Sequence, residues 1–244
     1  MIGIIIQARM GSTRLPGKVI RKIEGKTVLG HVIERLKRIE GVKIILATTV
    51  KKEDDVLEKI AKNCKIPVFR GLEDDVLDRY YQAAKSFGID PIVRITADCP
   101  VLDTKVAEKV IDFYLINNFD YVSNIHPVSY PDGLDVEVFS FKVLEKSWKK
   151  AKLKSEREHV TSYILKNPRI FKTGNVANNK DYSSFRLTLD EKEDLILIRK
   201  IYKELYDKNP FFGMEEILGL FEKKPELVKI NQHIGRNDGY FKSL

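Results

Sequence analysis

The chain has 244 residues, of which 43% are hydrophobic and 32% are charged, which excludes a disordered chain, a coiled coil and a disulfide-stapled miniprotein. Its formal net charge of +8 favours anionic partners, either nucleic acid, an acidic membrane surface or small phosphates. We find no transmembrane stretch, no signal peptide and no metal-ligand spacing of the two cysteines, so we expect a reduced, cytoplasmic protein.

The first half of the chain alternates short apolar runs with amphipathic segments. Strands are predicted at 2–7, 42–48, 66–69, 91–96 and 120–124, and helices at 27–39, 53–63, 74–87 and 104–117. Strands that alternate with helices of this length predict right-handed βαβ units. We therefore expect an α/β fold with a mostly parallel central sheet flanked by helices.

The second half is less regular. Residues 135–140 alternate with period two and predict a mixed or edge strand. Further helices are predicted at 141–152, 155–167 and 191–207, and further strands at 170–176 and 184–189. Residues 209–244, interrupted by proline and glycine, look like an appended helix and tail.

A glycine- and arginine-containing loop, QARMGSTRLPGK, follows the first predicted strand. Ligands of open α/β sheets bind at the carboxyl ends of the strands, where this loop begins. Gly11 and Gly17 allow close backbone approach, and Arg9, Arg14 and Lys18 supply cations for a polyphosphate. The glycine spacing fits neither a Walker A loop nor a dinucleotide fingerprint. An ordinary surface loop with incidental positive charge is the alternative.

Two carboxylates stand where predicted strands end. Asp98 lies in RITADCP and Asp190 in RLTLDEKEDL. Each could cap the helix that follows it, which is a common role for aspartate. Each could equally reach into the ligand crevice, and for Asp190 the two roles are compatible.

The segment IIQARMGSTRLPGK is similar to the opening motif of the CMP-sugar synthetase superfamily, and resembles most its SpsF-type branch of spore-coat polysaccharide biosynthesis. The resemblance extends to about residue 206. It implies a nucleotide-diphospho-sugar transferase fold (GT-A, Rossmann-like) and a cytidylyltransferase that transfers CMP from CTP to a sugar or sugar acid, releasing pyrophosphate. Residues 1–208 would form the nucleotidyltransferase domain, with an acceptor and dimerisation insertion at about 125–170 and a C-terminal helical appendage at 209–244.

The resemblance also implies a Mg²⁺ cofactor. Asp98 matches the aspartate of the family's Gly-Asp-x-Pro motif, although Ala97 replaces the glycine. Asp190 opens the motif Asp-x-x-x-Asp-Leu. Mg²⁺ is commonly held by one or two carboxylates together with substrate phosphates, so Asp98 and Asp190 are the expected metal ligands.

Catalytic and binding roles follow from the same resemblance. The expected catalytic residues are Arg14, Lys18 and Arg79, of which the first two would stabilise charge on the phosphates. The expected nucleotide-binding residues are Gln7, Ala8, Arg9, Gly11, Ser12, Thr48, Arg70, Gly71, Thr96 and Ala97. For Arg70, an ordinary surface position is the alternative.

Two later segments resemble family segments on the acceptor side. The expected acceptor-binding residues are Asp135, Glu137, Arg157, Glu158, His159 and Arg186. Asp135 and Glu137 are two residues apart and should share one face of a strand, where they could bind sugar hydroxyls or an amine, or simply form an exposed polar face. His159 with Arg157 could bind a substrate carboxylate.

Other functions remain as alternatives. A GT-A-fold glycosyltransferase would need a DxD-type metal motif, for which residues 135–137 (Asp-Val-Glu) are the only candidate. A non-catalytic nucleotide-binding protein would have no need of Arg14, Lys18, Asp98 and Asp190 together. We expect neither nucleic acid nor a membrane as partner, since no aromatic and basic platform is present. A homodimer is expected from the resemblance, and the acceptor stays open.

Overall fold

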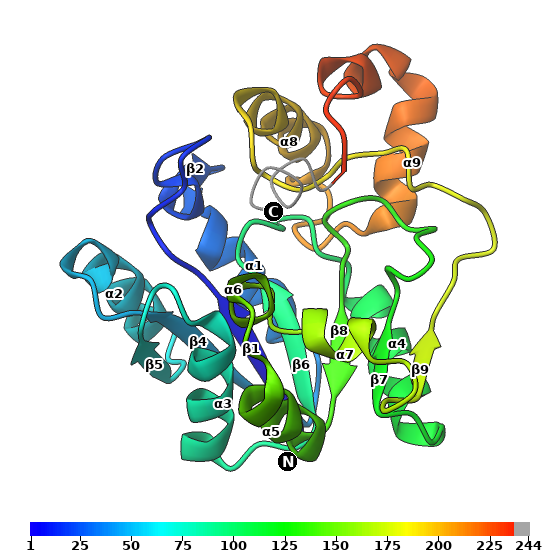
Figure 1. The fold of residues 1–244 in the computed structure, drawn as a ribbon. Coiled ribbons are helices and arrows are strands. Elements are labelled where there is room, and N and C mark those ends of the chain that lie inside the picture. Colours follow the sequence, from blue (N-terminus) through cyan, green and yellow to red (C-terminus); the bar gives the residue numbers. More distant parts are fainter. Residues whose placement is uncertain (237–244) are drawn as a thin grey trace.

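The computed structural model describes residues 1–236, which form a seven-stranded sheet covered by helices on both faces (Figure 1). The strand order is β5-β4-β1-β6-β8-β7-β9. The strands are β1 (Gly3–Gln7), β4 (Lys43–Thr49), β5 (Val68–Gly71), β6 (Ile92–Thr96), β7 (Tyr121–Ser123), β8 (Glu137–Phe139) and β9 (Thr173–Asn175). The α/β fold with a mostly parallel central sheet is confirmed, because β8 alone runs antiparallel to its neighbours.

The parallel half of the sheet is buried on both faces. Three consecutive isoleucines of β1, Ile4 to Ile6, are 0% exposed and divide between two apolar clusters. One cluster includes α1 (Val28–Leu36), α2 (Asp55–Asn63) and α4 (Thr104–Ile116), and the other α3 (Val76–Phe87), α5 (Phe141–Lys150) and α7 (Ser162–Lys166). Burial on both faces explains why β1 and the middle of β4 read as apolar runs in the sequence, whereas β5 and β6 each carry an arginine.

A third apolar cluster lies beyond the carboxyl edge of the sheet (Figure 1). It contains α8 (Lys192–Leu205), α9 (Met214–Lys223) and the 3₁₀ helix η3 (Pro225–Ile230). The short hairpin of β2 (Lys22–Ile23) and β3 (Lys26–Thr27) contributes Ile23, and was not predicted. Loops at the carboxyl edge therefore lie between the sheet and this cluster.

The predicted strand at 184–189 is wrong. Within residues 1–236, its only strand-like contact is an isolated bridge between Asp132 and Arg186. Leu187 and Leu189 are buried against α8 in the third cluster, so their alternation reflects packing on a helix rather than a sheet ladder. The prediction that 135–140 is a mixed strand holds, whereas the edge alternative does not, because β8 lies between β6 and β7.

The single helix predicted at 155–167 is also wrong. The segment forms two short helices, α6 (Lys154–Glu158) and α7. Between them, Val160 adopts a φ of 39°, which no right-handed helix can accommodate. The side chain of Val160 is buried in the cluster with α3 and α5.

Among the helices of residues 1–236, none combines the length and the hydrophobicity that a membrane span requires.

Candidate active site

The loop after β1 is held in place by the end of β4. The Met10 amide donates to Asp54 Oδ1 at 2.7 Å, and the Thr49 hydroxyl donates to Asp54 Oδ2. Asp54 is 0% exposed and belongs to the 3₁₀ helix η2 (Lys52–Asp54). Farther along, Gly17 adopts a φ of 65°, a conformation that glycine accepts without strain. We call residues 8–18 the phosphate loop.

Lys18, at the end of the phosphate loop, lies between two carboxylates. Its Nζ donates to Asp98 Oδ2 at 2.5 Å and to Asp190 Oδ1 at 2.6 Å. Burial lowers the pKa of Lys18, but the charges of Asp98 and Asp190 outweigh it and hold the pKa above its usual range. Burial raises the pKa of Asp98, but the charge of Lys18 and the hydrogen bonds to the carboxylate together lower it to about 2. Lys18 and Asp98 are therefore both charged at neutral pH.

The two carboxylates fit Mg²⁺. Asp98 follows β6 and Asp190 precedes α8, and both converge on one cationic atom, Lys18 Nζ. Mg²⁺ favours carboxylate oxygens and usually keeps positions for water and substrate phosphates. Residues 1–236 contain no group of three or more histidine, cysteine, aspartate or glutamate side chains that could hold a metal ion.

Asp194, which sequence reasoning did not select, fixes the orientation of Asp190. Its Oδ2 accepts from the backbone amides of Asp190 and Glu191, both at 2.9 Å. Arg186 donates to both Asp194 oxygens, and Asn231 donates to Oδ1 at 2.8 Å. Asp194 is the second aspartate of the family motif Asp-x-x-x-Asp-Leu that Asp190 opens, and this motif could have identified it.

The other two loop cations also contact acids. Arg14 forms ion pairs with Asp190 at 3.1 Å and with Glu191 at 3.3 Å. Arg9 contacts Glu73 at 3.4 Å. All three cations of the phosphate loop are therefore paired with carboxylates, Arg14 and Lys18 with Asp190, and Arg9 with Glu73.

Several nucleotide-binding candidates surround the carboxyl ends of β1, β4 and β6. Gln7 pairs with Thr96 in the sheet, and Ala97 donates its amide to Gln7 O. Buried polar atoms without a hydrogen-bond partner in the described residues include Gln7 Oε1 and Thr48 Oγ1. A buried polar atom without a partner lowers the stability of a folded protein and is therefore rare. The oxygens of Gln7 and Thr48 are thus free to form a hydrogen bond with a ligand. Ala8 is buried at the start of the phosphate loop, and Gly11 and Ser12 lie on it.

Arg79 is fully buried below these strand ends. One of its nitrogens donates to Leu72 O at 2.8 Å, while Nε and Nη2 have no partner in residues 1–236. Burial is the largest cause that lowers the pKa of Arg79. Gly71 permits this position, because a Cβ there would lie 3.3 Å from Arg79 Cγ.

Arg70 is not brought to the phosphate loop. It donates to Thr49 O and Lys51 O, both at 2.8 Å, and pairs with Asp55 and Glu58 at 2.7 and 3.0 Å. These contacts fasten β5 to the connection between β4 and α2.

The acceptor candidates divide into two groups. Glu137 is 2% exposed and is bonded to Arg94, Tyr121 and Thr161, so it is neither an exposed strand residue nor free to ligate a metal. Arg186 is likewise buried, with Asp132 at 2.9 Å and Asp194 at 2.9 Å. Burial, followed by repulsion from Asp135, raises the pKa of Asp132 to about 7.

The remaining acceptor candidates are more accessible. Asp135 pairs with Arg236 at 2.5 Å, a residue from the C-terminal segment that sequence reasoning did not select. Arg157 on α6 pairs with Asp75 at 2.5 Å, at the start of α3. Glu158 and His159 are half-buried at the end of α6, and burial lowers the pKa of His159.

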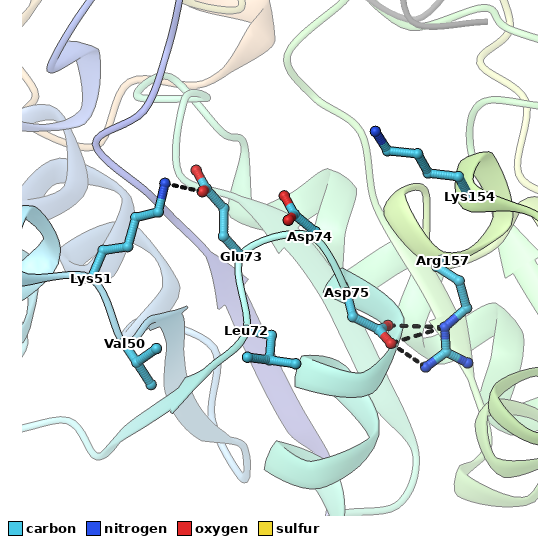
Figure 2. Close-up of a pocket in the computed structure, with 8 residues that line it drawn as sticks. All are labelled: Val50, Lys51, Leu72, Glu73, Asp74, Asp75, Lys154 and Arg157. Atoms are coloured by element: carbon cyan, nitrogen blue, oxygen red, sulfur yellow. Dashed lines mark hydrogen bonds and ion pairs between the residues drawn. The ribbon is translucent and has the colours of Figure 1, made fainter.

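A cavity of about 470 Å³ lies beside the phosphate loop, between the end of β4 and α6 (Figure 2). Its lining consists of Val50, Lys51, Leu72, Glu73, Asp74, Asp75, Lys154 and Arg157. Figure 2 shows the Asp75–Arg157 pair on the α6 side and the Lys51–Glu73 pair on the opposite side.

Comparison with known proteins gives consistent matches over the whole fold. A family model described as "Cytidylyltransferase" matches residues 3–232. The chain is 41% identical over 236 residues to the uncharacterized protein MJ1063 of Methanocaldococcus jannaschii, covering 94% of each. It is 30% identical over 230 residues to the spore coat polysaccharide biosynthesis protein SpsF of Bacillus subtilis, covering 91% of this chain and 94% of SpsF.

Solved structures agree. A cytidylyltransferase from Leptospira borgpetersenii superposes with a TM-score of 0.87 at 36% identity, covering 93% of this chain and 96% of the other. A CMP:2-keto-3-deoxy-manno-octonic acid synthetase complexed with CTP superposes with a TM-score of 0.64 at 17% identity, covering 83% of this chain and 98% of the other. At 17% identity, this second similarity shows a shared fold.

Proposed function

The chain belongs to the cytidylyltransferase family, and we propose that it transfers CMP from CTP to a sugar or sugar acid for a surface polysaccharide, releasing pyrophosphate. One observation carries the proposal. Two cations of the phosphate loop, Arg14 and Lys18, contact a pair of carboxylates, Asp98 and Asp190, at the carboxyl end of the sheet. This arrangement supplies positive charge for a triphosphate and oxygen ligands for a divalent cation at one place. The printed name of SpsF supports a polysaccharide role.

The reaction is an in-line substitution at the α-phosphorus of CTP. A hydroxyl of the acceptor attacks, its oxygen bonds to the α-phosphorus and the hydroxyl proton is lost. The bond from the α-phosphorus to the bridging oxygen breaks, and that oxygen leaves with pyrophosphate. Lys18 and Arg14 would turn from their carboxylates to the phosphate oxygens and stabilise the negative charge that develops there.

Asp98 and Asp190 would hold Mg²⁺, which supplies charge neutralisation and orients phosphate oxygens when bound. The hydrogen bonds of Asp194 keep Asp190 aimed at the same point as Asp98. The unpartnered polar atoms of Gln7, Thr48 and Arg79 would contact the nucleotide. We assign Asp135, Arg157, Glu158 and His159 to the acceptor side, and propose a cytoplasmic homodimer through the region of 125–170.

A pyrophosphate-release assay tests the proposal. It crosses the four nucleoside triphosphates with acidic and neutral sugars, with and without Mg²⁺. We expect release with CTP, an acceptor and Mg²⁺ together, and its loss in Asp98→Asn. Asp112→Asn, which changes an exposed acid on α4 in the same way, is the matched control. Absence of release with CTP and every acceptor would overturn the proposal.

A further inference from the structure

Glu73 bridges two cations at the edge of the phosphate loop. Its Oε1 lies 3.4 Å from Arg9 Nη1, and its Oε2 pairs with Lys51 Nζ. Glu73 lies in the connection between β5 and α3, and Lys51 comes two residues after β4 (Figure 2). The side chain of Glu73 is 18% exposed, against 39% for Arg9 and 51% for Lys51. A negative group is therefore enclosed by two more accessible positive ones.

The same carboxylate lies against Gly11 of the phosphate loop. A Cβ at Gly11 would come within 3.1 Å of Glu73 Oε1, which is closer than ordinary contact. A glycine in an anion-binding loop allows an anion to approach the backbone closely. In this structure the anion that uses the space is the side chain of Glu73.

The neighbouring acids do not share this arrangement. Asp75 caps α3 through the Asp78 amide and is held by Arg157, so it is fixed on both sides. Asp74 lines the cavity, and no ion pair within residues 1–236 involves it. Within the described residues, the ion pairs of Glu73 are with two long, partly exposed side chains, which can change partner at little cost.

We infer that Glu73 holds the position that a phosphate group of CTP takes on binding, and that Lys51 is a further polyphosphate-binding residue. The inference rests on the proposed function, since it assigns the anion to the nucleotide. A phosphate and a carboxylate cannot share the space over Gly11. The phosphate brings more charge and more acceptor oxygens, so it displaces Glu73 and takes over Arg9 and Lys51. The competition lowers the apparent affinity for CTP in proportion to the time that Glu73 occupies the position.

Calorimetric titration of the full chain with CTP in Mg²⁺-containing buffer tests the inference. We expect Glu73→Gln to tighten CTP binding about threefold to tenfold, and Lys51→Gln to weaken it by a similar factor. Asp74→Asn and Lys52→Gln make the same charge changes one residue away and should alter the Kd by about twofold at most. The gain in Glu73→Gln should recur with inorganic tripolyphosphate and be absent with cytidine, which has no phosphate. Melting temperatures measured alongside identify any variant that is not folded.

Three results would overturn the inference. Weaker CTP binding in Glu73→Gln would mean that Glu73 positions Arg9 for the nucleotide. Equal effects of Glu73→Gln and Asp74→Asn, or of Lys51→Gln and Lys52→Gln, would mean that only the overall charge matters. If the wild-type protein does not bind CTP at all, the proposed function fails, and this inference with it.

Discussion

We expect Asp54 to hold the phosphate loop in position without contacting the substrate itself. Its carboxylate joins the Met10 amide to the Thr49 hydroxyl and is 0% exposed. In Asp54→Ala both donors would stay buried without a partner, and each such loss costs about 1–3 kcal/mol. Relief of the buried charge offsets part of this, so we expect the free energy of unfolding to fall by about 2–4 kcal/mol. The loop that carries Arg9 would also lose its attachment to β4.

Asp54→Asn is the matched variant. Its amide oxygen can still accept from the Met10 amide, and its NH₂ group can donate to the Thr49 oxygen. We expect it to lose about 1 kcal/mol and to keep most of the wild-type KM for CTP. Urea unfolding and steady-state kinetics measure the two effects. The reasoning is refuted if Asp54→Ala and Asp54→Asn are equally stable, or if Asp54→Ala leaves the KM for CTP unchanged.

Lys18→Ala should lower kcat by about 10²–10³-fold with an unchanged circular dichroism spectrum, and a near-wild-type rate would remove Lys18 from the mechanism. Gly133→Ala should destabilise the protein by about 3 kcal/mol or more, because φ is 102° and the new Cβ would lie 2.5 Å from the backbone nitrogen of Thr188. Gly25→Ala is the matched control, since Gly25 has a φ of 77° but open space around it, and it should cost about 1 kcal/mol. Thermal unfolding of both variants measures the difference. Burial lowers the pKa of His31 from 6.5 to about 4 in the folded protein. As the pH falls, His31 is therefore protonated in the unfolded chain before it is protonated in the folded one, which favours unfolding. About 3 kcal/mol of the free energy of unfolding should be lost between pH 7 and pH 4. His31→Gln should flatten that part of the stability profile.

The sequence predicts the parallel half of the fold better than the remainder, for a physical reason. Strands β1, β4 and β6 are buried on both faces over most of their length, so their residues are mostly apolar, with Arg94 of β6 as the internal exception. After β7 the helices α5 and α8 still follow local patterns, but the segments between them are placed by contacts with distant parts of the chain. Leu187 and Leu189 alternate like strand residues, yet they pack on α8.

The same division applies to the site. The cations of the phosphate loop and the two strand-end aspartates are visible in the sequence, because a short segment carries each. The residues that hold these side chains in place are not visible in the sequence, because they come from distant segments. Asp54 is 44 residues from Met10, and Glu73 is 64 residues from Arg9. Glu137 was expected on the acceptor side because its segment resembles a family segment there, but Arg94 and Thr161 enclose it from distant segments.

The central claim is that this site joins a cytidylyl group to an acceptor hydroxyl. Phosphorus-31 NMR of the protein with CTP, Mg²⁺ and a sugar or sugar-acid acceptor, followed by mass spectrometry of the nucleotide product, tests it most directly. The account predicts one phosphodiester resonance and one equivalent of pyrophosphate, with a product mass equal to CMP plus acceptor less one water. Release of free CMP without a conjugate, or no consumption of CTP with any acceptor, would contradict it.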